Sequence, residues 1–375
     1  MEFENLDYKA IEMPDPQPTS PSQLPQMDQL LEELVLREAS DLHLRVGEPP
    51  IYRIGGRLVR SEFPVLKEDD TVTLMHSILS ETQRQRLDRE RELDLAFGLP
   101  GVARFRINVF HQRGYMGAVM RVIPLKIKSI DEWGLPPILK ELALLPRGLM
   151  LITGPTGSGK STTLAAMVHH INQKRKSHII ILEDPVEFLH QDSLSIIEQR
   201  EVGSDTNSFA LALRHIMRQN PDVILVGELR DYETMSLAIA AAETGHLVLA
   251  TLHTTDAAQT VDRIINTYPP ESQAQARVQL GTVLQAVVSQ ALLPSIKHKK
   301  LVAAFEIMLC TPAVRSVIRD GKTPQIYSLI QTGAKFGMQS LDQALRDLYI
   351  KGLVNLEDAL AKSSNPQELE QAIAR

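Results

Sequence analysis

Near the start of the chain, apolar residues recur first at helical spacing and then in alternation with polar residues. The helical stripe predicts a helix and is formed by Met27, Leu30, Leu31, Leu34 and Val35. Residues 40–46 alternate and predict a strand, whereas residues 51–59, with Gly55-Gly56, and 102–122, interrupted by Gly114 and Gly117, each predict a hairpin. Together these patterns predict a small α+β domain built on an antiparallel sheet.

Farther along the chain the pattern changes to short, continuous apolar runs that alternate with helical segments. Four such runs occur, at residues 149–153, 179–182, 223–226 and 247–252. Strands of this kind are buried on both faces, so they predict a parallel α/β sheet. Apolar stripes at 262–265, 278–291, 313–318 and 341–349 predict a mainly helical C-terminal part.

The two patterns are separated by segments rich in proline and charge. Five prolines among polar residues predict a flexible extension over residues 1–25. The α+β domain is expected over 26–124, a linker over 125–140, and the α/β domain with its helical end over 141–375.

Composition narrows the class of protein. The chain has 375 residues, of which 43% are hydrophobic and 23% charged, as expected of a folded protein with two domains. Its net charge of −6 disfavours a motor that tracks nucleic acid, because phosphate contacts need clustered Lys and Arg. No apolar run approaches the ~18 residues of a membrane span, and the acidic N-terminus does not resemble a secretory signal. We expect a cytoplasmic location.

The single cysteine, Cys310, limits the metal chemistry that the chain can perform. One thiol forms neither an internal disulfide nor a four-cysteine zinc site. It lies in the apolar run 305–310, so we interpret it as a small core residue.

A phosphate-binding pattern, G-x-x-x-x-G-K-[ST], occupies residues 154–161. It follows an apolar run and precedes a predicted helix, which is the strand–loop–helix context that phosphate binding requires. A purely structural glycine turn is therefore disfavoured. Lys160 is expected to reach the β- and γ-phosphates, and the Ser161 hydroxyl to bind Mg²⁺. The predicted nucleotide-binding set is Gly154, Pro155, Thr156, Gly157, Ser158, Gly159, Lys160, Ser161 and Thr162.

Three further apolar runs end near side chains that can act on a nucleotide. Glu187 follows the second run and is expected to orient or deprotonate the attacking water. Glu228 follows the third and is expected to bind Mg²⁺ through water, since Gly227 stands where many P-loop ATPases have an aspartate. His253 ends the fourth and is expected to contact the γ-phosphate. Each could alone be structural, but their convergence at one sheet edge favours a nucleotide site.

Other charged residues on predicted strands have less certain roles. Asp222 and His246 begin strands, so we expect them to be structural. Arg104, Arg106 and Arg121 lie on strands of the first domain. They either face solvent or act as arginine fingers on a neighbouring γ-phosphate, and the pattern leaves both possibilities open.

These motifs resemble those of the secretion ATPases. The phosphate loop, residues 183–187, residues 226–231 and residues 244–253 are similar to the Walker A, Asp box, Walker B and His box of that superfamily. The similarity is greatest to the type IV pilus retraction ATPases (the PilT family), and segments 39–44, 104–108, 313–319 and 337–345 extend it. The single cysteine favours retraction over assembly, because assembly ATPases usually contain a tetracysteine zinc module.

The resemblance implies a PAS-like first domain, a RecA-like second domain and a ring of six subunits. It also implies that ATP and Mg²⁺ bind between the domains, with Arg104, Arg106 and Arg121 completing the site. The ring is then expected at the cytoplasmic face of the inner membrane, on a pilus platform protein, where hydrolysis returns pilin to the membrane and powers twitching motility. A paralogous retraction ATPase is a further expected partner, and nucleic acid is not.

The resemblance also leaves alternatives open. Val314 and Ser316 replace the residues expected in the retraction motif, so an accessory retraction paralogue remains an alternative to the main motor. An assembly or secretion motor would use the same chemistry. A nucleic-acid motor and a non-catalytic ring partner are less favoured, by the acidic charge balance and by the intact carboxylates respectively.

Overall fold

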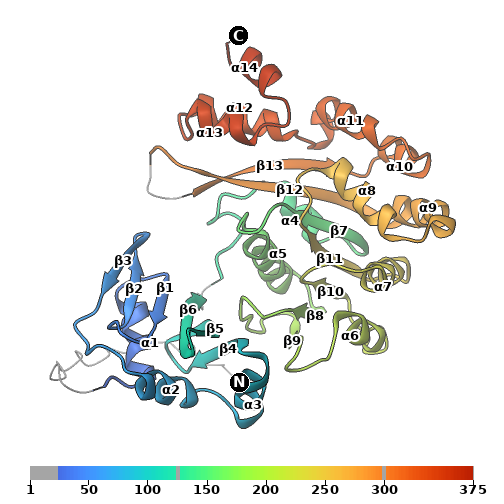
Figure 1. Ribbon diagram of the computed structural model, residues 1–375. Coiled ribbons are helices and arrows are strands. Elements are labelled where there is room, and N and C mark those ends of the chain that lie inside the picture. Colours follow the sequence, from blue (N-terminus) through green and yellow to red (C-terminus); the bar gives the residue numbers. More distant parts are fainter. Residues whose placement is uncertain (1–23, 124–126, 298–300, 375) are drawn as a thin grey trace, which may run out of the picture. The chain divides into compact units, whose positions relative to one another are not determined.

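The computed structural model describes residues 24–123, 127–297 and 301–374. The chain forms two compact units, Met1–Ile123 and Pro124–Arg375, which are shown in Figure 1. The proline-rich extension predicted for residues 1–25 lies almost entirely outside the described residues.

In its described residues, 24–123, the first unit is a six-stranded antiparallel sheet with three helices. The strand order is β3-β2-β1-β6-β5-β4. The strands are β1 (Asp41–Leu44), β2 (Ile51–Ile54), β3 (Arg57–Arg60), β4 (Glu92–Leu99), β5 (Ala103–Gln112) and β6 (Tyr115–Ile123). The helices are α1 (Met27–Leu36), α2 (Glu68–His76) and α3 (Glu81–Glu90). Alternation along β5 buries Phe105, Ile107 and Val109 on one face, which forms the core with α1.

One glycine of the predicted hairpins has a different role from the one expected. The β5–β6 turn is formed by Arg113 and Gly114, both at positive φ, whereas Gly117 lies inside β6. A Cβ added to Gly117 would lie 3.2 Å from the carbonyl oxygen of Leu44 on β1. Gly117 therefore permits a close approach of two strands, and it does not form the turn.

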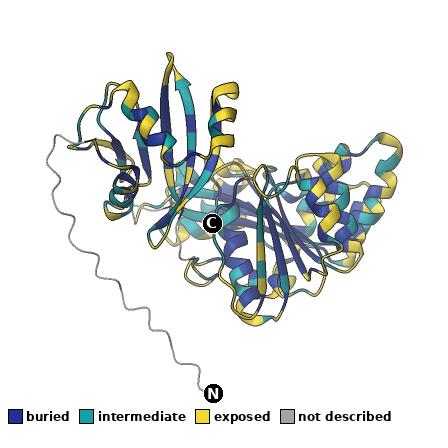
Figure 2. Ribbon diagram, turned by 90° about the horizontal axis from the view of Figure 1, so that it is seen from below, coloured by how far each residue is buried: buried dark blue, intermediate teal, exposed yellow. Residues whose placement is uncertain are grey.

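The second unit contains a seven-stranded sheet in the order β13-β12-β7-β11-β10-β8-β9. Its strands are β7 (Gly148–Thr153), β8 (His178–Glu183), β9 (Ile196–Glu201), β10 (Val223–Val226), β11 (Leu247–Leu252), β12 (Leu284–Pro294) and β13 (Leu301–Leu309). All neighbouring pairs are parallel except β12 and β13. Strands β7, β10 and β11, in the middle of the sheet, are buried along their whole length, as expected for strands covered on both faces, whereas the edge strand β9 is mostly exposed or half-buried. Figure 2 shows the buried interior of this sheet.

The helices of the second unit pack on both faces of this sheet and at its β13 end (Figure 1). They are α4 (Ile138–Ala143), α5 (Lys160–Lys174), α6 (Phe209–Ile216), α7 (Tyr232–Glu243), α8 (Ala257–Thr267), α9 (Gln273–Val283), α10 (Pro312–Arg319), α11 (Ile326–Thr332), α12 (Leu341–Ile350), α13 (Leu356–Lys362) and α14 (Pro366–Ala374). Short 3₁₀ turns occur at Pro270–Ser272, Thr323–Gln325 and Ala334–Phe336. Among the described residues, no helix is long and apolar enough to cross a membrane.

The prediction of helix across residues 278–291 is wrong in its second half. Helix α9 ends at Val283, and the chain continues as β12, which pairs with β7 on one side and β13 on the other. A short apolar run buried on both faces has no periodicity that separates strand from helix. Strand β9 was also not predicted. The interpretation of Cys310 as a core residue is confirmed, since it is buried and burial raises the pKa of its thiol to about 12.

Candidate functional site

The carboxyl ends of four parallel strands meet at one edge of the second sheet. Strand β7 pairs with β11, β11 with β10, and β10 with β8, all in parallel register. The phosphate loop follows β7, Glu183 ends β8, Glu228 follows β10, and His253 follows β11. The topology therefore brings together side chains that are far apart in sequence, at the edge where open α/β sheets bind ligands.

The phosphate loop (residues 154–161) leads directly into α5, whose first residue is Lys160. The Lys160 side chain is buried, and its Nζ donates hydrogen bonds to the carbonyl oxygens of Gly154, at 2.7 Å, and Pro155, at 3.1 Å. Burial lowers the pKa of Lys160, while the charges of Glu228 and Glu187 act in the opposite direction. Both predicted carboxylates thus lie close enough to Lys160 to act on its charge.

Glu228 connects the lysine to the histidine at the end of β11. One carboxylate oxygen of Glu228 lies 3.1 Å from Nε2 of His253, and the other accepts a hydrogen bond from Nε of Arg230 at 2.8 Å. The His253 Nδ1 atom lies 3.5 Å from Nζ of Lys160. Lys160, His253 and Glu228 therefore form one continuous polar chain, in which the imidazole can respond to whatever binds at the lysine.

The segment that contains Glu187 is held in place by a residue that the sequence did not indicate. Strand β8 ends at Glu183, and a cis peptide bond follows between Asp184 and Pro185. The backbone N–H of Val186 donates to a carboxylate oxygen of Glu201 at 3.1 Å. Glu201 is buried at the end of the unpredicted strand β9, so it fixes the backbone next to Glu187.

Gln290, on β12, supports the phosphate loop from behind. Its Nε2 donates to the carbonyl oxygen of Ser158 at 2.5 Å, and its Oε1 accepts from the Thr163 hydroxyl at 2.8 Å. Gly154 and Gly159, both at positive φ, leave room for this contact. A Cβ at Gly154 would lie 2.3 Å from the Gln290 carbonyl oxygen, and one at Gly159 would lie 2.7 Å from its Nε2. Gln290 was missed because β12 was predicted as helix.

A steric effect also favours glycine at position 227, where many P-loop ATPases have an aspartate. A Cβ on Gly227 would lie 3.1 Å from the carbonyl oxygen of Leu182 and 3.2 Å from Cα of Glu183, on the neighbouring strand β8. Its carbonyl oxygen accepts a hydrogen bond from the Thr251 hydroxyl. A side chain at position 227 would therefore require the backbone of β8 to move by a few tenths of an ångström, and Glu228 is the acidic residue next to it in sequence.

The two residues expected to be structural lie at the amino ends of the strands. Asp222 accepts a hydrogen bond from the backbone N–H of His178 at 2.8 Å, between β10 and β8. The His246 Nδ1 atom lies 2.8 Å from the carbonyl oxygen of Ala241. Both satisfy backbone groups where strands begin.

Three predicted arginines belong to the first unit and lie on the outer face of its sheet. Arg106 and Arg121 are directly opposite each other on β5 and β6, and Arg121 is opposite Asp41 on β1. Arg121 donates to Asp41 at 2.8 Å, and Arg53 lies 3.3 Å from the same carboxylate. Burial would raise the pKa of Asp41, but hydrogen bonds from Ser40 and Arg121 hold it below its usual value. This face therefore has two arginines directly opposite each other, and it also includes the carboxylates of Asp41 and Asp94.

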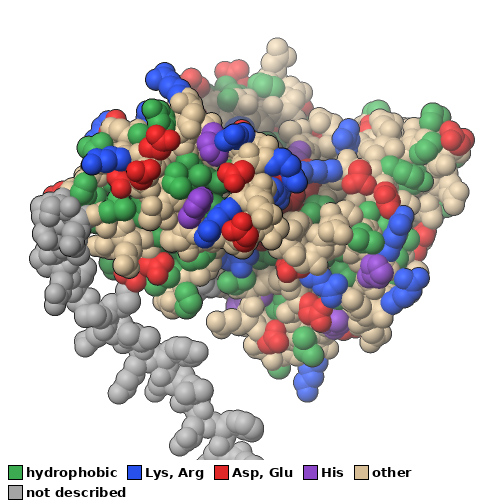
Figure 3. All heavy atoms as spheres, turned by 60° about the horizontal axis from the view of Figure 1, so that its bottom comes forward, with side chains coloured by type: hydrophobic (Ala, Val, Ile, Leu, Met, Phe, Trp, Pro, Cys, Tyr) green, Lys and Arg blue, Asp and Glu red, His purple; other side chains and the backbone are tan. Residues whose placement is uncertain are grey.

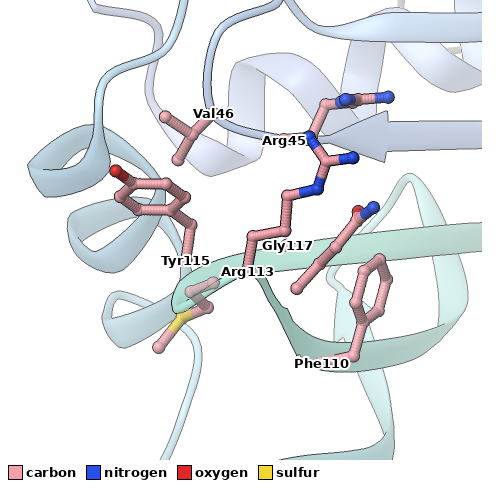
Figure 4. A pocket seen from close by; sticks show the side chains of 8 residues that line it. Arg45, Val46, Phe110, Arg113, Tyr115 and Gly117 are labelled. Carbon is pink, nitrogen blue, oxygen red and sulfur yellow. The ribbon is translucent and has the colours of Figure 1, made fainter.

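Two cavities complete the description. One of about 480 Å³ lies beside the phosphate loop and is lined by Thr156, Asp256, Gln290, Leu341 and Ser363 among others. The other, of about 170 Å³, lies in the first unit; Figure 4 shows Arg45, Phe110, Arg113 and Tyr115 around it. On the face seen in Figure 3, acidic and basic side chains are interspersed and form no continuous basic band.

The chemistry of the donors at the strand ends suits a hard divalent cation. Ser161 offers a hydroxyl oxygen at the start of α5, and Glu228 offers carboxylate oxygens at the end of β10. Oxygen ligands of this kind, supplemented by water and phosphate, are those that Mg²⁺ prefers.

Comparison with known proteins places the chain in a defined family. The sequence profile of the family described as "Type II/IV secretion system protein" matches residues 20–346. The chain is 48% identical to the type IV pilus retraction ATPase PilT of Pseudomonas aeruginosa, over 88% of this chain and 95% of that protein. It is 40% identical to the type IV pilus ATPase PilU of the same organism, over 93% and 91%.

A solved structure agrees with the sequence comparison. The crystal structure of the pilus retraction motor PilT with bound ADP is similar at a TM-score of 0.87 and 46% identity, covering 92% of this chain and 99% of that one. This similarity confirms the predicted fold class, an N-terminal α+β domain followed by a P-loop ATPase domain. The chain therefore belongs to the type II/IV secretion ATPase family, in the group that contains the type IV pilus retraction ATPases.

Proposed function

We propose that the chain hydrolyses ATP with Mg²⁺ as a homohexamer and that hydrolysis powers retraction of a type IV pilus. The observation that supports this most directly is the convergence of Lys160, Glu228, Glu187 and His253 at one sheet edge. The similarity to PilT supports the biological role, because it extends over nearly the whole of both chains.

In this proposal the residues have distinct tasks. The backbone N–H groups of residues 154–161 and the Lys160 ammonium bind the phosphates, replacing the carbonyl contacts that Lys160 now makes. Ser161 and Glu228 hold Mg²⁺, which when bound neutralises charge on the phosphate oxygens. Glu187 orients or deprotonates the attacking water. His253 contacts the γ-phosphate and, through Glu228, reports its presence.

Arginines of the first unit are proposed to complete the nucleotide site. Arg104, Arg106 and Arg121 lie on one face of the sheet, where Arg106 and Arg121 are directly opposite each other. In a ring, these guanidinium groups could contact the phosphate oxygens of a nucleotide bound to a neighbouring subunit. Arg106→Ala should then lower kcat at least about 10-fold with little change in ATP binding; an unchanged kcat would mean that Arg106 only faces solvent.

The proposed location and partners follow from the same role. The ring would dock at the cytoplasmic face of the inner membrane, on the pilus platform protein, and nucleic acid would have no part. Counting surface pili in a strain that lacks the protein tests the role. Surplus pili are expected, whereas bald cells would indicate an assembly motor.

An accessory retraction ATPase is the second candidate, because Val314 and Ser316 depart from the expected retraction motif. The chain is also 40% identical to a second type IV pilus ATPase, PilU, over 93% of its length. In that case, deletion would leave the number of surface pili unchanged while the purified protein still hydrolyses ATP. Pairwise copurification with a paralogous ATPase of the same strain would support this candidate. A purified protein that binds ATP without hydrolysing it would instead identify a non-catalytic ring partner.

A further inference from the structure

Glu306, on β13, is a buried carboxylate held at the N-termini of two helices. It is 2% exposed, and one of its oxygens accepts a hydrogen bond from the backbone N–H of Ala257 at 2.8 Å. Ala257 is the first residue of α8. The backbone N–H of Leu341, the first residue of α12, also stabilises the charged form of Glu306. A negative charge at this point is favourable to both helices, whose N-termini are electropositive.

The start of each helix lies beside a different group of interacting residues in the second unit. Helix α8 begins shortly after His253, which contacts Glu228 and Lys160. Helix α12 contains Asp342, which accepts hydrogen bonds from the Ser363 hydroxyl at 2.7 Å and from backbone N–H groups of the same loop. This loop, the phosphate loop and the starts of α8 and α12 line the same cavity of about 480 Å³.

A buried charge at this position costs free energy that a neutral side chain of the same size would not. The pKa of Glu306 is raised to about 7, mainly by burial and also by the nearby carboxylates of Asp256 and Asp342, against the N–H groups of Ala257 and Leu341, which lower it. The charge of Glu306 also contributes to raising the pKa of the Tyr327 phenol, on α11. Packing alone would favour a neutral side chain at this position. The presence of the Glu306 carboxylate therefore suggests a role that depends on its location between the two helices.

We propose that the Glu306 carboxylate is a positioning residue that ties the loop bearing His253 to the C-terminal helices, so that nucleotide state and the position of α12 are coupled. The coupling rests on the proposed ATPase function, because His253 is the group that senses the nucleotide. When Glu306 is charged, α8 and α12 are held together through their N-termini. When it is neutral, this link weakens, and α12 no longer follows the state of the nucleotide.

Stability and turnover should respond to pH in opposite directions. The folded-state pKa of Glu306 lies above that of an unfolded glutamate, 4.5. The folded state therefore binds this proton more tightly than the unfolded state. The resulting stabilisation is fully present below about pH 4.5 and is lost as pH rises through about 7. Glu306→Gln stays neutral and keeps an acceptor oxygen for Ala257, so it should gain stability relative to wild type between about pH 6 and about pH 8. Turnover should instead be highest where Glu306 is charged.

The test compares full-length wild type, Glu306→Gln and the matched control Glu370→Gln, an exposed glutamate on α14. Steady-state ATPase kinetics are measured from about pH 6 to about pH 8, with thermal unfolding alongside. At about pH 8, Glu306→Gln should lower kcat about 10-fold, change KM less than about 3-fold, and lose the wild-type dependence of kcat on pH near 7. Glu370→Gln should behave as wild type in every respect.

Hydrogen exchange measured with and without ADP tests the coupling and requires only that the protein binds ADP. In wild type, ADP should alter exchange in α12, and in Glu306→Gln this response should disappear although ADP still binds. If Glu306→Gln does not fold, Asp342→Asn, which loosens the loop at 363–365 without altering β13, should remove the same response. A wild-type kcat profile together with an intact ADP response in α12 would overturn the proposal. If the wild-type protein did not hydrolyse ATP, the proposed function would be contradicted. Hydrogen exchange in the presence of ADP would still show whether Glu306 couples nucleotide binding to α12.

Discussion

The two edges of the parallel sheet use the same types of side chain for opposite purposes. At the amino edge, Asp222 and His246 each contact backbone groups of adjacent segments. At the carboxyl edge, Glu228 and His253 contact each other, and His253 also approaches Lys160. A side chain at the amino edge completes the fold locally, whereas one at the carboxyl edge joins residues that only the topology brings together. The position along a strand, more than the residue type, decides which role is possible.

Removing Lys160, at the carboxyl edge, should lower ATPase activity more than any of the other substitutions. In Lys160→Ala, the phosphates lose their only buried cation in the loop, so kcat/KM should fall at least about 100-fold, on the order of 3 kcal/mol. ATPase kinetics and nucleotide-binding titration measure this. Exposed Lys174→Ala, on the same helix, is the control. Near-wild-type turnover in Lys160→Ala would contradict the site assignment.

Neutralising Glu187 should separate chemistry from binding. Glu187→Gln keeps the shape of the side chain but cannot accept a proton, so kcat should fall about 100-fold or more while ATP still binds. Single-turnover kinetics and a binding titration distinguish the two effects. An equal loss of binding would mean that Glu187 is structural, like Glu201 beside it.

Removing the support behind the phosphate loop should have an intermediate effect. Gln290→Ala removes the hydrogen bonds to Ser158 and Thr163, so KM for ATP should rise about 10-fold and stability should fall by about 1–3 kcal/mol. Steady-state kinetics and denaturant unfolding measure both. Gln325→Ala, at an exposed glutamine, should change neither. A change in stability with an unchanged KM would show that Gln290 supports only the fold.

The smallest effect on ATPase activity is expected from a substitution at the amino edge. Asp222→Ala removes the acceptor for the His178 N–H and should cost about 1 kcal/mol of stability, while kcat and KM stay within about 2-fold of wild type. Unfolding and ATPase measurements on the same preparation test this. A large loss of turnover would remove the distinction between the two edges.

The sequence was most informative where a chemical pattern coincided with a strand end. Lys160 was identified from the phosphate-binding pattern, and Glu228 and His253 were identified because each lies at the end of a continuous apolar run; parallel pairing then places them together. Gln290 and Glu306 were not identified. They lie within β12 and β13, where a buried polar residue interrupts an apolar run without any local signal of its partner. Their partners, Ser158 and Ala257, are distant in sequence, so only tertiary structure reveals the contacts.

The fold shows the same limit. Alternation and glycine turns identified the β2–β3 and β5–β6 hairpins of the first unit, because those are local features, whereas β4 was not predicted. Strand β9 alternates weakly, and its existence depends on pairing with β8. The β12–β13 hairpin likewise depends on pairing with β7, so its apolar run was assigned to a helix.

The fit between Gly154 and β12 has a consequence for engineering. Because a methyl group at Gly154 would collide with the Gln290 carbonyl oxygen at 2.3 Å, the loop and the strand behind it are one steric unit. Transplanting the loop into another scaffold, or recombining it between homologues, should succeed only when the partner strand is transferred with it.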